Sequence, residues 1–116
     1  MIAQYIMIGD HKWNILVYYN VDLYGLTEVK EMLSRLDCPK RYMRKALNVL
    51  RNYNTGLTYS NNKYEMSIVC ISRTTSEEQM MNSIAHEVKH VQSHICEYYD
   101  VEEDTEAAAY LTGYII

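Results

Sequence analysis

The sequence predicts a small α+β domain in which paired strands and paired helices alternate along 116 residues. One observation is that some segments are rich in β-branched and aromatic residues and are bounded by turn residues. A second is that other segments repeat apolar residues at helical spacing. No repeat, low-complexity tract or Pro/Gly-rich linker interrupts the chain, so residues 1–116 are expected to form a single domain with one modest core.

A hairpin and two helices are predicted for the first half of the chain. Ala3–Ile8 and Trp13–Tyr19 have the composition of strands, and the turn residues 9–12 lie between them. Leu26–Leu36 carries apolar residues at helical spacing. Pro39 suits the first turn of a second helix.

Two strands and two further helices are predicted for the second half. The helix-stopping stretch 52–56 is followed by the strands Leu57–Ser60 and Tyr64–Ser72, which complete a small mixed or antiparallel sheet. Ser76 and Gln79 form a capping box, which predicts the start of a long helix that continues to about Tyr98. A last helix is expected after a loop at Asp100.

Composition narrows the class of protein. The net charge of −4 argues against nucleic acid as the main partner, because such proteins are usually basic. No apolar segment is long enough for a membrane span and no signal peptide is evident, so neither membrane insertion nor export is expected. The three cysteines, Cys38, Cys70 and Cys96, show no pairing motif, and we expect reduced thiols and a cytoplasmic location.

One basic cluster falls in the second predicted helix. We interpret it as a solvated helix face, with a docking patch as the alternative. Its members are Lys40, Arg41, Arg44, Lys45 and Arg51.

The sequence His86-Glu87-Val88-Lys89-His90 is an H-E-x-x-H motif inside the long predicted helix. Residues four apart lie on one face of a helix, so two imidazoles can reach one zinc ion. The glutamate beside the first histidine can then act as a general base toward zinc-bound water. The motif therefore predicts a zinc site with His86 and His90 as ligands and Glu87 as base.

The phase of the helix agrees with this prediction. At about 100° per residue, the histidines point away from the apolar arc, and Glu87 falls at one border of it. The arc itself contains Met80, Ile84, Val88, Val91 and Ile95. We therefore expect both histidines to face a cleft.

A third protein ligand is needed to complete a catalytic zinc site. His94 would lie about 12 Å along the helix from His86, too far to share one ion, and is expected at the cleft wall or surface. The last predicted helix offers Glu102, Glu103 and Glu106. Glu106 is favoured because small residues on its face would let the two helices approach closely.

These features resemble the gluzincins, zinc peptidases with H-E-x-x-H on one helix and a glutamate ligand on the next, and in particular their minimal single-domain forms. The resemblance is specific over Ser76–His90, moderate over Glu106–Tyr114 and only architectural before Ser76. It implies a zincin-like fold and hydrolysis of peptide bonds. It also implies that substrate binds as an added strand at a sheet edge, near Ser67–Ser72.

Larger gluzincins also use a Tyr or His to stabilise the oxyanion. Tyr110, Tyr98, Tyr99 and His94 are the candidates here, although simple packing is the expected role of each. The main alternative to a peptidase is a zinc-binding regulatory or interaction module with the same frame and no turnover. A third interpretation treats the motif as accidental in an ordinary interaction domain.

Overall fold

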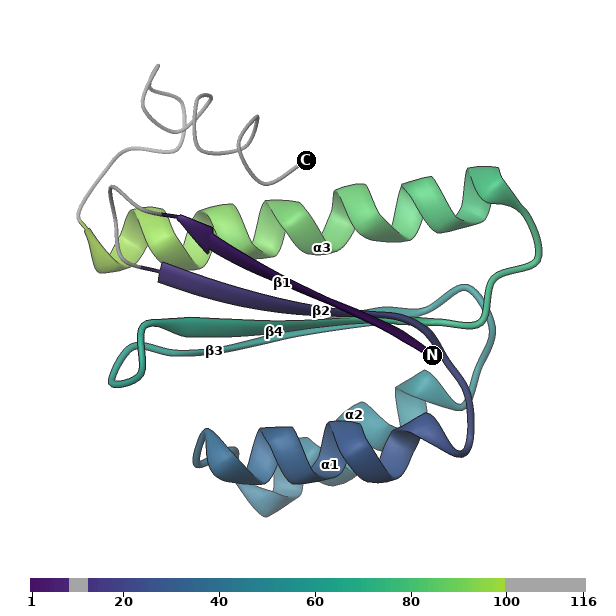
Figure 1. Cartoon of the computed structure of the whole chain (residues 1–116), viewed down its shortest axis with the longest axis horizontal. Coiled ribbons are helices and arrows are strands. Elements are labelled where there is room, and N and C mark those ends of the chain that lie inside the picture. The colour runs from purple at the N-terminus through teal and green to yellow at the C-terminus, as the bar shows by residue number, and fades with distance from the viewer. Residues whose placement is uncertain (9–12, 100–116) are drawn as a thin grey trace.

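A four-stranded mixed sheet forms the centre of the molecule and carries helices on both faces (Figure 1). The computed structural model describes residues 1–8 and 13–99. The strands are β1 (Ile2–Ile8), β2 (Trp13–Val21), β3 (Gly56–Asn61) and β4 (Met66–Ser72). The helices of this part of the chain are α1 (Gly25–Arg35), α2 (Lys40–Leu50) and α3 (Glu77–Tyr98). The predicted α+β class is therefore confirmed.

The strand order is β1-β2-β4-β3. The two hairpin pairs, β1 with β2 and β3 with β4, are antiparallel, and β2 and β4 are parallel in the middle. β4 is therefore an interior strand, and β3 forms the edge beside it. This agrees with the composition of β4, whose residues 67–72 are all buried. The segment expected near a substrate-binding edge thus lies one strand inside that edge.

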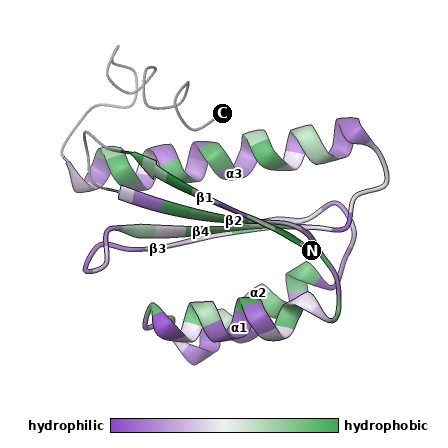
Figure 2. Cartoon of the chain, viewed as in Figure 1, coloured by the Kyte–Doolittle hydropathy of each residue, from purple (hydrophilic) through white to green (hydrophobic). Residues whose placement is uncertain are grey.

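The two faces of the sheet are buried in separate clusters. On one face, α3 packs Val88, Val91 and Ile95 against the sheet. On the other face, α1 and α2 cover a second cluster that includes Ile68 and Cys70 of β4. Figure 2 shows the same division, with apolar central strands between helices that are polar on their outer sides. The three cysteines are buried and none is in a disulfide, as expected.

The long helix starts where the sequence predicts. The Ser76 hydroxyl oxygen accepts a hydrogen bond from the Gln79 backbone N–H at 3.1 Å, as an N-cap does. None of the helices in the described ranges is long and apolar enough to cross a membrane. The last predicted helix, with Glu102, Glu103, Glu106 and Tyr110, lies outside the described residues.

We expect Ser76→Ala to lower the free energy of unfolding by about 1 kcal/mol, because a donor in the first turn of α3 loses its partner. Urea denaturation followed by circular dichroism measures the change. Ser34→Ala is the matched control, since Ser34 is exposed inside α1 and alanine is a good helix former there. Equal effects of the two substitutions would contradict the capping role.

Candidate metal centre

The two histidines of the motif meet on the outer side of α3. Their Nε2 atoms lie 3.1 Å apart, and the His86 side chain is 70% exposed. Two nitrogens at this separation can each lie at about 2.0–2.1 Å from one zinc ion, with an angle of about 100° between the bonds. That angle is close to tetrahedral. The spacing of the pair thus suits a shared cation.

Glu87 lies against the sheet, deeper than its place at the border of the apolar arc predicts. Only 4% of the residue is exposed. Its Oε1 accepts a hydrogen bond from the Thr58 hydroxyl of β3 at 2.9 Å, and its Oε2 lies 4.0 Å from Nε2 of His86. A buried carboxylate is costly unless it is hydrogen-bonded, and Thr58 offsets part of that cost. One oxygen is therefore anchored while the other faces the histidine pair.

Gly56 makes room for this carboxylate. A Cβ atom added at Gly56 would lie 3.0 Å from both Cγ and Oε2 of Glu87, and 3.1 Å from the Cys70 carbonyl oxygen. The glycine is needed here for close approach rather than for an unusual backbone angle. The end of β3 nearest the motif is thus shaped around Glu87.

His94 is tied to the sheet by a chain of hydrogen bonds. Its Nδ1 lies 2.6 Å from the Ser60 hydroxyl oxygen, which lies 2.7 Å from the Ser67 hydroxyl oxygen. The indole N–H of Trp13 donates to Ser67 at 2.9 Å. This series of hydrogen bonds links β2, β4, β3 and α3 through polar groups in the interior.

The direction of these hydrogen bonds follows from the requirement that every buried donor has an acceptor. Ser67 is fully buried and accepts from Trp13, so its own hydroxyl proton must go to Ser60. Ser60 then donates to Nδ1 of His94. The imidazole is consequently neutral with its proton on Nε2. This is consistent with the prediction that His94 is a cleft-wall residue and not a ligand.

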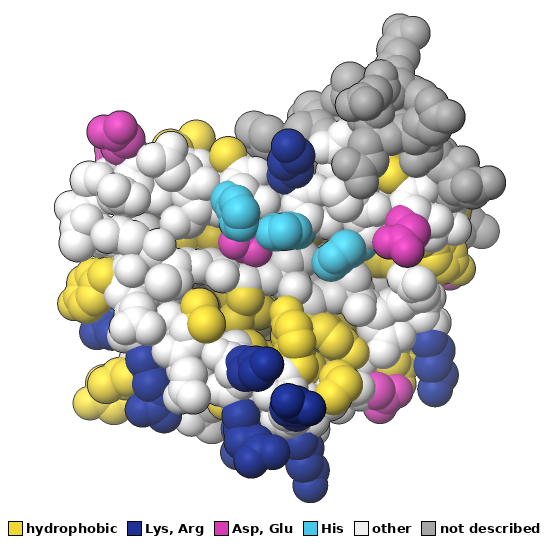
Figure 3. Space-filling view, turned by 180° about the vertical axis from the view of Figure 1, so that it is seen from behind, with side chains coloured by type: hydrophobic (Ala, Val, Ile, Leu, Met, Phe, Trp, Pro, Cys, Tyr) yellow, Lys and Arg dark blue, Asp and Glu magenta, His cyan; other side chains and the backbone are white. Residues whose placement is uncertain are grey.

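A cavity of about 390 Å³ opens beside His86 and Glu87. Its walls include Gln79, Ser83 and His86 of α3, Val49 of α2, and the start of β3 at Gly56. Figure 3 shows this side of the molecule, with the histidines in a row across its middle and an acidic side chain beneath them. The row thus lines an open surface, as the helix phase predicts.

Residues 1–8 and 13–99 contain no group of three His, Cys, Asp or Glu side chains that could hold a metal ion. The described part of the site therefore supplies two imidazoles, and the predicted third ligand, Glu106, lies outside it. Tyr98 and Tyr99 lie at the far end of α3. Tyr98 packs edge-on against Trp13, and the Tyr99 hydroxyl donates to Glu65, so both have the structural roles expected of them.

The comparisons give no further assignment, since no protein-family model, curated protein or solved structure matches this chain.

Four residues of the site were not identified from the sequence. They are Gly56, Thr58, Ser60 and Ser67. A usable signal was present: small residues alternate at positions 56, 58 and 60, which is the period of one face of a strand. The interpretation of 52–56 as a helix stop hid its first member.

We expect His94 of the metal-free chain to titrate below 6.5, the ordinary pKa of histidine. Burial lowers the pKa of His94 most, and the neighbouring His90 lowers it further. Between the folded pKa and 6.5 the unfolded chain binds more protons, so this group makes stability fall as pH decreases through that window. Histidine ¹H–¹⁵N spectra across the pH range measure both tautomer and pKa. A pKa of His94 at or above 6.5, or a proton on its Nδ1 at neutral pH, would contradict the direction assigned to these hydrogen bonds.

Proposed function

We propose that the chain is a zinc-dependent metallopeptidase of the gluzincin type, with His86, His90 and Glu106 as zinc ligands and Glu87 as general base. The observation that carries the proposal is the 3.1 Å separation of the two Nε2 atoms beside a buried, anchored carboxylate. A structural zinc site has no need for such a carboxylate, whereas H-E-x-x-H metallopeptidase sites use one as the general base.

The donors present suit zinc. Neutral imidazole nitrogens and a carboxylate oxygen are ligands that zinc accepts, and three protein ligands leave one position for water or substrate. When bound, zinc supplies Lewis acidity, which lowers the pKa of a water molecule and polarises a carbonyl group. The sequence places Glu106 sixteen residues after His90, on the last predicted helix.

Glu87 performs the proton transfers in this proposal. Thr58 fixes Oε1, so Oε2 is the oxygen that takes a proton from the attacking water and returns it to the leaving amine. The tight packing at Gly56 limits rotation of the side chain and keeps Oε2 toward His86. Orientation of the base thus comes from β3.

His94 is the favoured group for the carbonyl oxygen of the substrate. It lies one helical turn beyond His90, with ring centroids 6.5 Å apart, and its Nε2 carries a proton when Ser60 holds Nδ1. A fixed neutral donor of this kind stabilises developing negative charge without reorganisation. Tyr98 and Tyr99 are occupied by packing and by Glu65, which makes them weaker candidates.

We expect the purified chain to bind one zinc ion with micromolar affinity or better, and His86→Ala or His90→Ala to abolish that binding. Glu106→Ala is expected to weaken affinity by about 100-fold or more, since a ligand is lost. Mass spectrometry of metal content and competition with a chelating dye measure these effects. Lys89→Ala is the control, because Lys89 is exposed on the same turn of α3. Absence of zinc after reconstitution would exclude the proposal, and full affinity in Glu106→Ala would move the third ligand to Glu103 or Glu102.

We expect Glu87→Gln to retain zinc and to lower kcat by about 100-fold or more, because the amide cannot accept the proton. Cleavage of a broad peptide library, read by mass spectrometry, measures the loss. Thr58→Val keeps the carboxylate and removes only its anchor, so a smaller loss of kcat is expected. Equal inactivity of the zinc-loaded wild type and Glu87→Gln would favour the regulatory module without turnover.

A further inference from the structure

We propose that the zinc site acts on extended acidic peptides, which add to the open edge of β3 and direct alternate acidic side chains toward α2. The inference rests on the proposed function for the site itself, and it deepens that function by naming the substrate class. Three features carry it: the outward peptide groups of β3, the face of α2 beside them, and the charge of that face.

The open edge of β3 is set by its register with β4. Ser72 N–H donates to the Thr55 carbonyl at 2.9 Å, which makes Thr55 and Ser72 a hydrogen-bonded pair of the antiparallel ladder. Because such pairs alternate, the peptide groups of residues 57, 59 and 61 point to β4 and those of 56, 58 and 60 point outward. The Thr58 carbonyl confirms this direction, since it accepts from the Tyr42 hydroxyl of α2 at 2.9 Å.

The residues with outward peptide groups are also those that hold the site. The side chain of Thr58 anchors Glu87, and that of Ser60 anchors His94. A peptide paired with this edge would therefore run directly beside the motif. The Thr58 carbonyl has a second lone pair, so the bond from Tyr42 leaves it able to accept from such a peptide.

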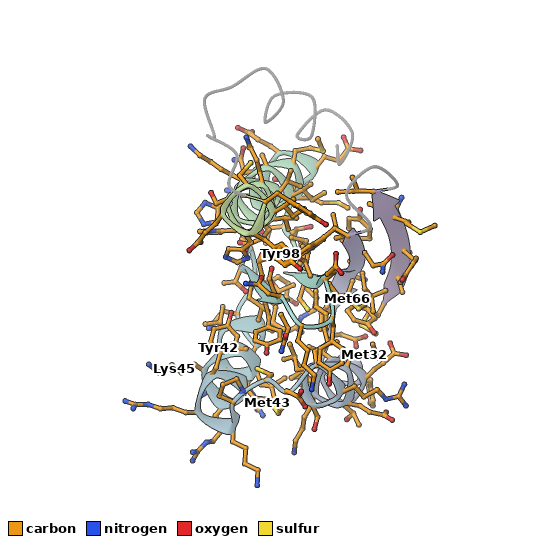
Figure 4. All side chains as sticks on the ribbon, turned by 90° about the vertical axis from the view of Figure 1, so that its left-hand side faces the viewer. Met32, Tyr42, Met43, Lys45, Met66 and Tyr98 are labelled. Carbon is orange, nitrogen blue, oxygen red and sulfur yellow. The ribbon has the colours of Figure 1, made fainter. Side chains whose placement is uncertain are left out.

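One face of α2 lies along the same edge. Tyr42 reaches the Thr58 carbonyl, and Val49 lines the cavity with His86 and Glu87. Lys45 lies between them at three- and four-residue spacing, so the three share one face of the helix. Figure 4 shows Tyr42 and Lys45 close together on α2, with Lys45 projecting outward. Arg41 is one helical turn before Lys45 in the sequence.

The charge of this region is entirely positive. Residues 38–64, which include α2 and β3, contain six Lys or Arg and no Asp or Glu. The ion pairs of the described ranges, Arg35–Glu31, Lys63–Asp37 and His86–Glu87, include no residue of α2. Figure 3 shows Lys and Arg side chains below an apolar strip on the face that carries the histidine row. The members of the basic cluster are all exposed, and Val49 of the same helix lines the cavity beside His86.

These features favour an extended peptide with acidic side chains at alternate positions. In a strand added to β3, successive side chains point alternately toward α3 and toward α2. Those that point toward α2 would meet an apolar layer that includes Tyr42 and Val49, and a charged layer of Lys45 and Arg41. Acidic side chains with an apolar stem, such as glutamate, match both layers, whereas lysine is repelled. The anionic alternative, single-stranded nucleic acid, lacks the backbone N–H and C=O groups that a strand edge pairs with.

The test measures binding rather than cleavage, so it does not depend on zinc. A labelled peptide of about nine residues that alternates Val and Glu is titrated with the metal-free full-length chain, and fluorescence anisotropy is read at ~50 mM salt. A second probe carries Lys in place of Glu. We expect the glutamate probe to bind at least about ten-fold more tightly, and this preference to shrink in high salt. Equal affinity for the two probes would overturn the proposal.

Matched variants locate the surface. Lys45→Glu is expected to weaken binding of the glutamate probe by about five-fold or more, whereas Lys30→Glu on α1 makes the same change of net charge and is expected to leave binding unchanged. Both lysines are exposed, so neither variant disturbs the core. Equal loss in both variants would mean attraction by net charge alone and would overturn the assignment to α2.

Two further probes test strand addition. Glutamate peptides N-methylated at odd or at even positions lose alternate N–H groups, and only one of the two sets faces β3. We expect one peptide to lose binding and the other to retain it. Equal binding of both, or tighter binding of a single-stranded oligonucleotide than of the glutamate probe, would overturn the proposal. Zinc content is measured separately, so failure of the metal site and failure of peptide binding are distinguished.

Discussion

The rotation of α3 on the sheet is the constraint on which the candidate site depends. Val88, Val91 and Ile95 pack into the cluster around β2 and β4, and Val91 is completely buried. Each residue of a helix adds about 100° of rotation, so fixing this stripe fixes every other direction on α3. His86 and His90 are thereby turned outward. Glu87, one residue later, is turned toward β3.

Residues 56, 58 and 60 of β3 contribute through their side chains on one side and through their peptide groups on another. Its side chains at 56, 58 and 60 face α3, and small size is required of all three because Glu87 and His94 occupy the space above them. The peptide groups of the same residues point away from the sheet. A substitution in this strand that disturbs Glu87 would therefore also disturb the edge beside it. The orientation of the Glu87 carboxylate and the exposed edge cannot vary independently.

Much of the fold follows from local sequence signals. The hairpin, the two helices after it and the start of α3 at Ser76 depend on turn residues, spacing and capping, all of which act over a few positions. The strand order was beyond such signals, because pairing β2 with β4 joins segments about fifty residues apart. The interior place of β4 and the edge position of β3 became visible only with that pairing.

The distinction between local sequence signals and long-range contacts also applies to the candidate site. His86 and His90 were identified from a motif within one helix, and the structure places their Nε2 atoms 3.1 Å apart. Periodicity put Glu87 at a border, but its burial depends on Gly56 and Thr58, thirty residues earlier in the chain and brought close only by tertiary contact. Glu106 stays a prediction. The basic cluster is exposed, as a solvated helix face is, and its role in docking stays a proposal.

The series of hydrogen bonds from Trp13 to His94 makes the fluorescence of Trp13 an intrinsic reporter of the His94 side chain. Trp13 is the single tryptophan of the sequence, is completely buried, and is joined to the imidazole by three successive hydrogen bonds. Indole emission responds to the polarity and hydrogen bonding at its ring nitrogen. An event that draws the His94 ring away from Ser60 therefore changes the acceptor seen by Trp13 without any ligand touching the indole. The intrinsic fluorescence of the protein is thus coupled to the position of the His94 side chain.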